Sequence, residues 1–542
     1  MSTRKNRTRV LTAGAVTAAL ALAGAGYGIA SAAEDLPALA FRAATHDVTV
    51  TRYVEDGTPW MDFDLGVNLI AGKQPFEIRA KRNSYSQPIV ATQEVTGADG
   101  KKASVALPDG LFTTFDGFQD FTAVTIKDTA GATVREYSTD WCPNTWNSLR
   151  TRPDAPSSTP YPQSCAGGNP FILGSVWGVQ AGYNAAIEAT PRFDWQDPDA
   201  EQFDLPAGKY QITIKLNEKF RSWLAVPAES ATVDLNVTVV DSVVDRGGEP
   251  EGAIRAKAAV KAAAVGDELP PGKAALRGEH SEHDGQGDAS VQVSAFDPNF
   301  RPPAKAPKTL AATPKAGPKP DLRSLPAWGI DLSNEDGKTY VNFGATVWNA
   351  GSSPLVVDGF RRTGTDLMDA YQYFFDKNGK EVGSVGAGTM EWDPREGHFH
   401  WHFTDFAQYN LLNSDQSLAV RSGKEAFCLA NTDAVDYTIP NAKWRPENTD
   451  LSTSCGANTA VAVREVLDIG NGDTYSQSRP GQSFEITDLP NGTYYIQTLA
   501  NPENKLAETK TTNNSSLRKI VLGGTVGGER TLKVPAVHGI EG

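Results

Sequence analysis

The chain has 542 residues, a length that suits two to four domains of ordinary size. Its 65 Asp and Glu outnumber its 51 Lys and Arg, and the net charge of −14 argues against a nucleic-acid partner. Beyond the N-terminal region no stretch is apolar for long enough to cross a membrane, so we expect no membrane span.

The N-terminal segment has the pattern of an export signal. A positive cluster from Arg4 to Arg9 precedes an apolar run that ends near Ala25, and small residues follow at 30–32. A membrane anchor is the alternative, but the run is short and rich in Ala and Gly. We therefore expect a signal peptide over residues 1–32 and a secreted protein, extracellular or in the cell wall.

Residues 33–245 have the pattern of a β-sandwich domain. Short alternating or β-branched runs such as 210–214 and 233–240 recur, and Gly, Pro and Asp clusters separate them. No long run has helical periodicity, which favours two packed antiparallel sheets.

Residues 246–318 differ in composition and predict a flexible linker rich in Ala and Pro. An Ala-rich stretch at 256–265 could form a short helix, and Pro and Lys dominate 302–320. Aromatic residues almost disappear, so the segment cannot bury a core.

Residues 319–538 return to the β pattern and resemble the first β region. The segment 340–354 is similar to 60–75, and 489–494 is similar to 205–210. Two similarities in the same order favour tandem related domains, although sandwich turns reuse Pro and Gly and convergence stays open. The predicted fold class is all-β, with two tandem β-sandwich domains joined by the linker.

The four cysteines fall into two pairs that are far apart in the sequence. In an exported protein such pairs predict two local disulfides, Cys142–Cys165 and Cys428–Cys455.

Three of the seven histidines alternate in the run His398-Phe399-His400-Trp401-His402-Phe403. In a strand, alternate residues share a face, so we expect the three imidazoles on one face and the three aromatic rings in a core on the other. Imidazole suits copper, zinc and nickel, and three nitrogens leave positions open for water or substrate. An exposed strand face without a ligand is the alternative.

Beyond the histidines, an acid, an aromatic residue and Tyr-Xaa-Leu-Leu complete a longer motif. With these residues, the stretch from His398 to Leu412 resembles the copper-binding segment of the lysyl oxidase family. The likeness covers residues 320 to about 520 and excludes the N-terminal region and the linker. The segments that carry it are His398 to His402, Asp405-Phe406, Tyr409 to Leu412, Lys424 to Leu429, Asp473-Thr474-Tyr475 and Asn513-Asn514.

The resemblance implies a cofactor made from the protein itself. In this family a lysine amine adds to an oxidised tyrosine ring to give lysine tyrosylquinone, and the matching residues are Lys424 and Tyr475. The lysine must lose its proton to act as a nucleophile, which a desolvated site or a metal ion would favour.

Asp405 is the candidate general base, because it lies three residues after His402 and belongs to the family pattern. The odd spacing puts it on the opposite strand face unless a bulge intervenes. A positioning role or a plain structural role is the alternative.

The resemblance also implies a calcium ion near the start of the C-terminal domain. Its matching oxygen ligands are Asp321, Leu322 by its carbonyl, Glu508, Asn513 and Asn514. Lys510 stands where the family carries an acid, which would weaken this site.

The implied function is that of a copper- and quinone-dependent amine oxidase of the protein-lysine 6-oxidase type. It would convert primary amines, lysyl side chains or small amines, to aldehydes, using oxygen and releasing hydrogen peroxide and ammonia. The alternative is a non-catalytic, copper-binding extracellular structural protein, which needs neither Lys424 nor Tyr475. A zinc hydrolase would also use three histidines, but it leaves the same two residues unexplained.

Overall fold

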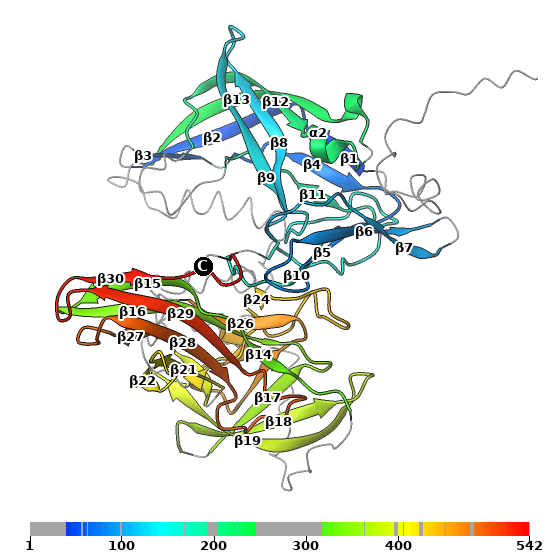
Figure 1. The fold of residues 1–542 in the computed structure, drawn as a ribbon. Helices are drawn as coiled ribbons and strands as arrows, with labels where there is room; N and C mark the ends of the chain where they lie inside the picture. The colour runs from blue at the N-terminus through cyan, green and yellow to red at the C-terminus, as the bar shows by residue number, and fades with distance from the viewer. Residues whose placement is uncertain are drawn as a thin grey trace, which may run out of the picture.

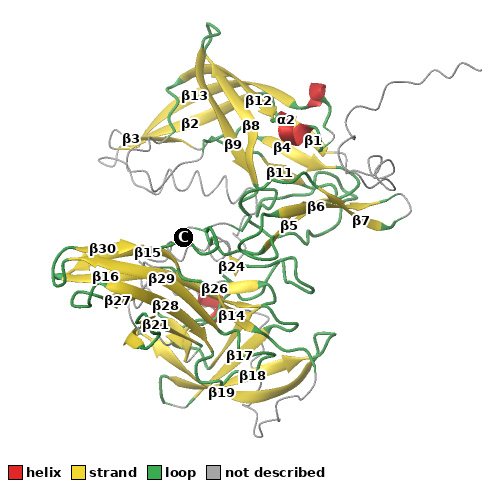
Figure 2. Cartoon of the chain, viewed as in Figure 1, coloured by secondary structure: helices red, strands yellow, loops and turns green. Residues whose placement is uncertain are grey.

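The computed structural model confirms the predicted all-β fold class, with strands throughout both halves of the molecule (Figures 1 and 2). The predicted signal peptide and residues 246–316 of the predicted linker lie outside the described residues. The structure describes residues 39–55, 58–61, 63–97, 100–166, 168–191, 203–224, 226–244, 317–362, 364–394, 399–404, 406–421, 426–449, 451–476 and 482–540.

The N-terminal half, residues 39–244 of the described chain, contains three sheets around one apolar core. Two short helices, α2 (Glu218–Arg221) and η1 (Ala228–Ser230), precede its last strand. The sheets are, in spatial order, β1 (Leu39–Ala43), β4 (Val67–Ala71), β11 (Asn184–Ala186); β10 (Gly174–Val179), β5 (Phe76–Lys81), β6 (Val90–Thr96), β7 (Lys102–Ala106); and β3 (Thr58–Met61), β2 (Asp47–Glu55), β13 (Thr232–Val244), β12 (Gly208–Leu216), β8 (Phe118–Lys127), β9 (Thr133–Trp141).

The C-terminal half, residues 317–540 of the described chain, also contains three sheets and a second core. A short helix, α4 (Leu451–Ser454), lies outside the sheets, and β15 (Trp328–Glu335) and β27 (Ser483–Glu485) pair with β16. The sheets are β14 (Leu322–Ser324), β16 (Lys338–Asn349), β26 (Asn471–Tyr475), β24 (Asp433–Ala434); β23 (Ala426–Phe427), β20 (His400–Thr404), β19 (Glu381–Asp393), β18 (Leu367–Phe375), β17 (Leu355–Arg361), β25 (Ala462–Leu467); and β22 (Leu418–Arg421), β21 (Ala407–Leu412), β28 (Gly492–Ala500), β29 (Ser515–Gly524), β30 (Arg530–Lys533).

Most strands follow the alternation that the sequence predicts. In β12, Ile212, Ile214 and Leu216 are buried, while Gln211 and Lys215 between or beside them are exposed. Such strands have one face on the core and one face in solvent. The strands β10, β21 and β26 instead consist entirely of buried residues, so each must be covered on both faces.

The similar segments 205–210 and 489–494 adopt the same local structure. Each opens a long strand, and in each the tyrosine hydroxyl donates to the carbonyl of the proline four residues earlier. The distances are 2.8 Å for Tyr210 to Pro206 and 2.9 Å for Tyr494 to Pro490. This bond anchors the start of a strand to its preceding turn, as tyrosine corners do in sandwich domains. The common origin of the two halves and the domain boundaries stay predictions.

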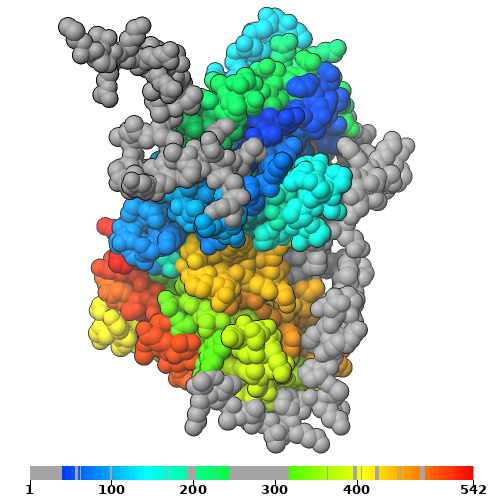
Figure 3. Space-filling model, turned by 90° about the vertical axis from the view of Figure 1, so that its right-hand side faces the viewer, coloured from blue at the N-terminus to red at the C-terminus, as the bar shows by residue number. Residues whose placement is uncertain are grey.

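The two halves are in contact through residues 161–174 of the first and 433–445 of the second. The N–H of Leu173 donates to the carbonyl of Val435 at 2.8 Å, and the N–H of Tyr437 donates to the carbonyl of Gly174 at 2.9 Å. In Figure 3, atoms of the blue and cyan half lie directly against yellow-orange atoms of the other half. This contact covers the second faces of β10 and β26.

Candidate functional site

The strand that carries the histidines begins at His400, whereas the sequence predicts that it begins at His398. Trp401 and Phe403 are buried in the core, as predicted. The prediction for Phe399 was wrong, because its side chain is 60% exposed and its φ of 33° lies in the left-handed region. A strand cannot continue through such a residue, and β20 accordingly begins at His400. His398 itself lies outside the described residues.

His400 and His402 lie side by side on β20 with their rings facing one another. Both are buried, and their Nε2 atoms are 2.9 Å apart. β20 pairs with β19 in a register that sets His400 opposite Asp393. The Oδ2 of Asp393 lies 3.3 Å from Nδ1 of His402, so the carboxylate occupies the ring nitrogen that faces away from His400.

This arrangement fits a metal ion held by imidazole. Ligand nitrogens lie about 2 Å from a bound ion, so two of them must approach within about 4 Å of each other, and 2.9 Å meets that requirement. A carboxylate beside the other nitrogen of a ligating histidine favours one orientation of the ring. Within the described residues no group of three or more His, Cys, Asp and Glu side chains is arranged for a metal, and His398, the third predicted ligand, is not among those residues.

Tyr475 is the last residue of β26, and its ring is buried against Phe427 with centroids 5.0 Å apart. Its hydroxyl donates to the carbonyl of Cys428 at 2.9 Å and accepts from the N–H of the same residue at 3.0 Å. Burial raises the pKa of Tyr475 well above its ordinary value, and the nearby Asp473 raises it further. The phenol is therefore neutral at physiological pH in the metal-free protein.

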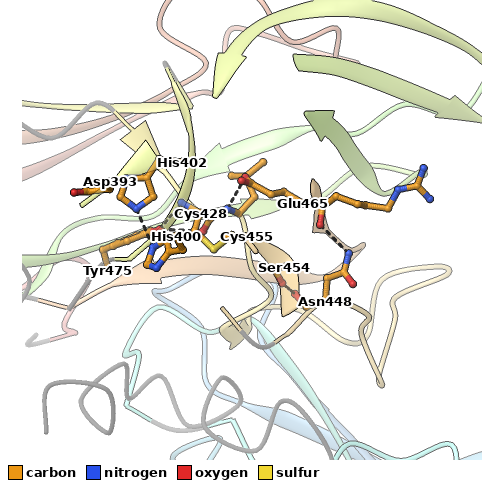
Figure 4. The surroundings of a disulfide bond; sticks show 11 residues. Asp393, His400, His402, Cys428, Asn448, Ser454, Cys455, Glu465 and Tyr475 are labelled. Atoms are coloured by element: carbon orange, nitrogen blue, oxygen red, sulfur yellow. Dashed lines mark hydrogen bonds and ion pairs between the residues drawn. A yellow bond between two sulfur atoms is a disulfide. The ribbon is translucent and has the colours of Figure 1, made fainter. Parts of the chain in front are cut away.

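Both predicted disulfides are present, and Cys428–Cys455 joins the tyrosine to the histidine strand. Cys428 holds the hydroxyl of Tyr475, while the carbonyl of Cys455 accepts from the N–H of Trp401 at 2.9 Å. Trp401 lies between the two histidines in β20. Figure 4 shows the imidazoles, Asp393 and Tyr475 together in the surroundings of this disulfide.

The buried carboxyl group of Glu465 contacts the same segment at Leu429, the residue after Cys428. Its Oε2 accepts from the N–H of Leu429 at 2.9 Å, and within the described chain its Oε1 has no hydrogen-bond partner. Burial raises the pKa of Glu465 well above its ordinary value, and Asp473 adds to the effect. Glu465 thus fixes the N–H of Leu429 while Tyr475 bonds the backbone of Cys428, so both residues of this segment are held.

Lys424 and Asp405 lie outside the described residues, so their predicted roles stay predictions. Sequence reasoning missed Asp393 and Glu465. A hairpin between the strand that ends at Asp393 and the one that begins at His400 is the signal that could have found the first. Glu465 lies in a strand distant in sequence from Leu429, and no local pattern marks it.

The residues predicted to bind calcium lie close together. Glu508 accepts from the N–H of Leu322 at 2.9 Å and from the amide of Asn514 at 2.7 Å. The amide of Asn513 donates to Asp321 at 3.1 Å. Burial raises the pKa of Glu508, and the nearby Asp321 contributes to the rise. Lys510 is exposed, so the lysine at the acid's position is directed to solvent and not buried in the cluster.

Three oxygens of this cluster lack a hydrogen-bond donor. Within the described part of the chain, Oδ1 of Asp321, Asn513 and Asn514 are each buried without a partner. Buried acceptors are normally satisfied, and hard oxygen atoms are the ligands that calcium prefers. The donor set fits such an ion, although Arg323 already contacts the other oxygen of Asp321 at 2.9 Å.

The sequence model of the family described as lysyl oxidase matches residues 377–527. The matched range contains the three histidines, Lys424 and Tyr475. It does not reach Asp321 and Leu322, or any part of the N-terminal half. Among the described residues, no helix combines the length and apolar character that a membrane span requires.

Curated relatives carry the same family name. The chain is 27% identical to lysyl oxidase homolog 3B of Danio rerio over 130 residues, which are 24% of this chain and 14% of that protein. It is 30% identical to lysyl oxidase homolog 4 of Mus musculus over 129 residues, 24% of this chain and 15% of that protein. Homolog 2 of Gallus gallus is 26% identical over 160 residues, 29% of this chain and 18% of that protein. The chain thus spans less than a fifth of the length of these relatives.

Proposed function

Because residues 377–527 belong to the lysyl oxidase family, we propose that the chain is a copper-dependent amine oxidase that uses a quinone made from Lys424 and Tyr475. The overall reaction converts a primary amine RCH₂NH₂, oxygen and water into the aldehyde RCHO, ammonia and hydrogen peroxide. One observation carries this proposal. The Nε2 atoms of His400 and His402 lie close together, and a single disulfide connects their strand to the segment that holds the buried Tyr475.

His398, His400 and His402 are the residues that hold the copper in this proposal, and Asp393 orients the last of them. Copper supplies one-electron chemistry with oxygen, by which a nearby phenol is oxidised. The protein supplies position: Cys428 fixes the hydroxyl of Tyr475, and Phe427 packs against its ring. The neutral amine of Lys424 would add to the oxidised ring of Tyr475 and replace a ring hydrogen, and oxygen would take up the two electrons and two protons released when the adduct returns to the quinone.

In catalysis the substrate amine binds where its α-carbon proton can be removed, and Asp405 is the residue we assign to that removal. Burial keeps bulk water away from the ring of Tyr475. We also propose export of the chain, with primary amines or lysyl side chains and oxygen as its partners.

Peroxide release from a primary amine tests this function. Lys424→Ala should bind copper in the same ratio as the unsubstituted protein and lose peroxide production from butylamine or a lysyl peptide. Lys519→Ala, which removes an exposed lysine of the same half, should leave both properties unchanged. Oxidation of amines by Lys424→Ala at the unsubstituted rate would show that the quinone is absent and favour the non-catalytic copper-binding protein.

We propose a calcium ion at Asp321, the carbonyl of Leu322, Glu508, Asn513 and Asn514. The ion would satisfy the three buried oxygens and join the first strand of the C-terminal half to the end of the β28–β29 connection. It supplies structural charge and no redox chemistry.

Calcium at a hundred times its dissociation constant should raise the free energy of unfolding by about 2.7 kcal/mol. Asn513→Ala should remove that increase, while Asn491→Ala, in an exposed turn, should keep it. The measurement is thermal unfolding with calcium, with magnesium and with a chelator. An increase of equal size with both ions, or none with calcium, argues against the site.

A further inference from the structure

β26, the strand that ends at Tyr475, has strand partners on both edges only at its start. It pairs with β16 from Gly472 to Tyr475, but its pairing with β24 stops at Gly472. In the described chain, a side chain contacts the β24 edge of the strand at Thr474, because the N–H of Thr474 donates to Oγ1 of Thr432 at 2.7 Å. β16 therefore supports one edge of β26 as far as Tyr475, and side-chain contacts support the other edge beyond Gly472.

One face of β26 packs inside the C-terminal half, and the other face lies against the N-terminal half. Alternation places Tyr475 and Asp473 on one face and Thr474 on the other. The side chain of Thr474 lies against the N-terminal half, whose Asn169 reaches the same group of hydroxyls. Figure 1 shows β26 and β24 on the side of the C-terminal half that meets the other half.

Asn169 closes a ring of hydrogen bonds with Thr346, Thr474 and Asp433, all of them buried. Its amide donates to Oγ1 of Thr346 at 3.0 Å and to Oδ2 of Asp433 at 3.0 Å. The hydroxyl of Thr474 donates to the same Oδ2, so the hydroxyl of Thr346, 2.7 Å from Thr474, must be the donor in that pair. Each hydrogen bond of the ring can therefore run in one direction only. This restricts the side chain of Thr474 to one rotamer.

The loop that carries Asn169 is itself fixed. The Oδ1 of Asn169 accepts from the N–H of Phe171 at 3.0 Å. The side chain of Phe171 is fully buried and packs with Leu325, Trp348 and Val435 of the other half. An apolar contact of this kind, with backbone hydrogen bonds beside it, opposes relative motion of the two halves. Asn169 is thus a rigid support and not a mobile loop residue.

We propose that Asn169 is a positioning residue for Tyr475: from the N-terminal half it fixes the outer face of β26 and thereby the tyrosine ring that Lys424 must reach. The consequence for the quinone rests on the proposed function. The N-terminal half, which lies outside the family match, is on this view a structural part of the catalytic unit.

Hydrogen exchange of the metal-free, full-length protein tests the support itself. Loss of buried hydrogen bonds in Asn169→Ala should speed amide exchange over residues 471–475 by about tenfold or more. Asn169→Asp should speed it further, because it sets a second carboxyl 3.0 Å from Asp433. The double variant Asn169→Asp/Asp433→Asn restores one donor and one acceptor and should return exchange toward the original rate.

Asn184→Ala is the matched control, since this amide makes side-chain hydrogen bonds with Asn68 and Leu149 inside the N-terminal half. It should leave exchange at 471–475 unchanged. Unchanged exchange in Asn169→Ala, or an equal increase in the control, overturns the proposal.

The second readout is the rate at which phenylhydrazine-reactive quinone appears after copper and oxygen are added. In Asn169→Ala that rate should fall about tenfold or more while the copper content stays the same. A normal rate beside faster exchange overturns the positioning role. If the unsubstituted protein forms no quinone, the proposed function fails, and the exchange measurement alone decides whether Asn169 holds β26.

Discussion

At the residue scale, His402 is constrained at both of its ring nitrogens. Nδ1 faces Asp393 and Nε2 faces His400, so the ring has one orientation and its metal-facing nitrogen is set. That His400 and His402 share a strand face could be predicted, because the strand period is fixed by backbone geometry. The sequence analysis missed Asp393, because its place opposite His400 follows only from the pairing of β19 with β20.

Substitutions at this pair should separate ligation from orientation. His400→Ala should remove most bound copper, because it deletes a ligand. Asp393→Asn should keep the stoichiometry and weaken copper affinity by about 10- to 100-fold. His46→Ala, an exposed histidine of the other half, should change neither. The measurement is copper titration with metal analysis, and full copper retention by His400→Ala rules the ligand assignment out.

Asp468 gives the site region a pH-dependent stability. Burial raises its pKa to about 6, and a hydrogen bond from the N–H of Glu447 and the charge of Lys443 only partly oppose that rise. The folded protein therefore binds a proton that the unfolded chain has released between about pH 4 and 6, so the contribution of this group to stability is lost as pH rises through that window.

Asp468→Asn should remove this loss, because the amide stays neutral and its oxygen can still accept from Glu447. The free energy of unfolding of the variant, relative to the unsubstituted protein, should rise by about 2–3 kcal/mol between pH 4 and pH 7. Denaturant unfolding at several pH values measures it. A constant difference between the two proteins across that range would contradict the assignment.

At the element scale, the sequence predicts strands that have one face in solvent. It does not predict where β20 begins or which strands are buried on both faces. Strands with one face in solvent, such as β12, show the alternation that predicts them. Phe399 broke the prediction, because the sequence does not reveal that its backbone turns left-handed ahead of β20. The fully buried β10 and β26 have no face in solvent, and the reason is contact between the halves, which no local pattern encodes.

The two disulfides close loops of similar length, with sequence separations of 23 and 27 residues, and so form a matched pair. Replacing either pair with alanine should lower the free energy of unfolding by about 3 kcal/mol. Only Cys428→Ala/Cys455→Ala should also slow quinone formation, because Cys428 holds the hydroxyl of Tyr475. Denaturant unfolding and phenylhydrazine titration check this, and an equal slowing by Cys142→Ala/Cys165→Ala would contradict it.

At the scale of the whole molecule, the site draws on segments from most of the C-terminal half and on one loop of the other half. The histidines were singled out by a short alternating motif, and Lys424 and Tyr475 by the family resemblance; their roles stay predictions. Asn169 and Glu465 could not be predicted, because their roles arise only when segments distant in sequence pack together. The contact of β10 with residues 435–437 brings the two halves together around β26.

The most direct test of the account is peptide mapping of the full-length protein before and after aerobic loading with copper. After loading, one peptide should contain Lys424 and Tyr475 joined by a covalent bond, and phenylhydrazine should label it. Before loading, and in Lys424→Ala after loading, the two segments should be recovered as separate peptides. Separate, unmodified peptides from copper-loaded protein that nonetheless releases peroxide from amines would contradict the account.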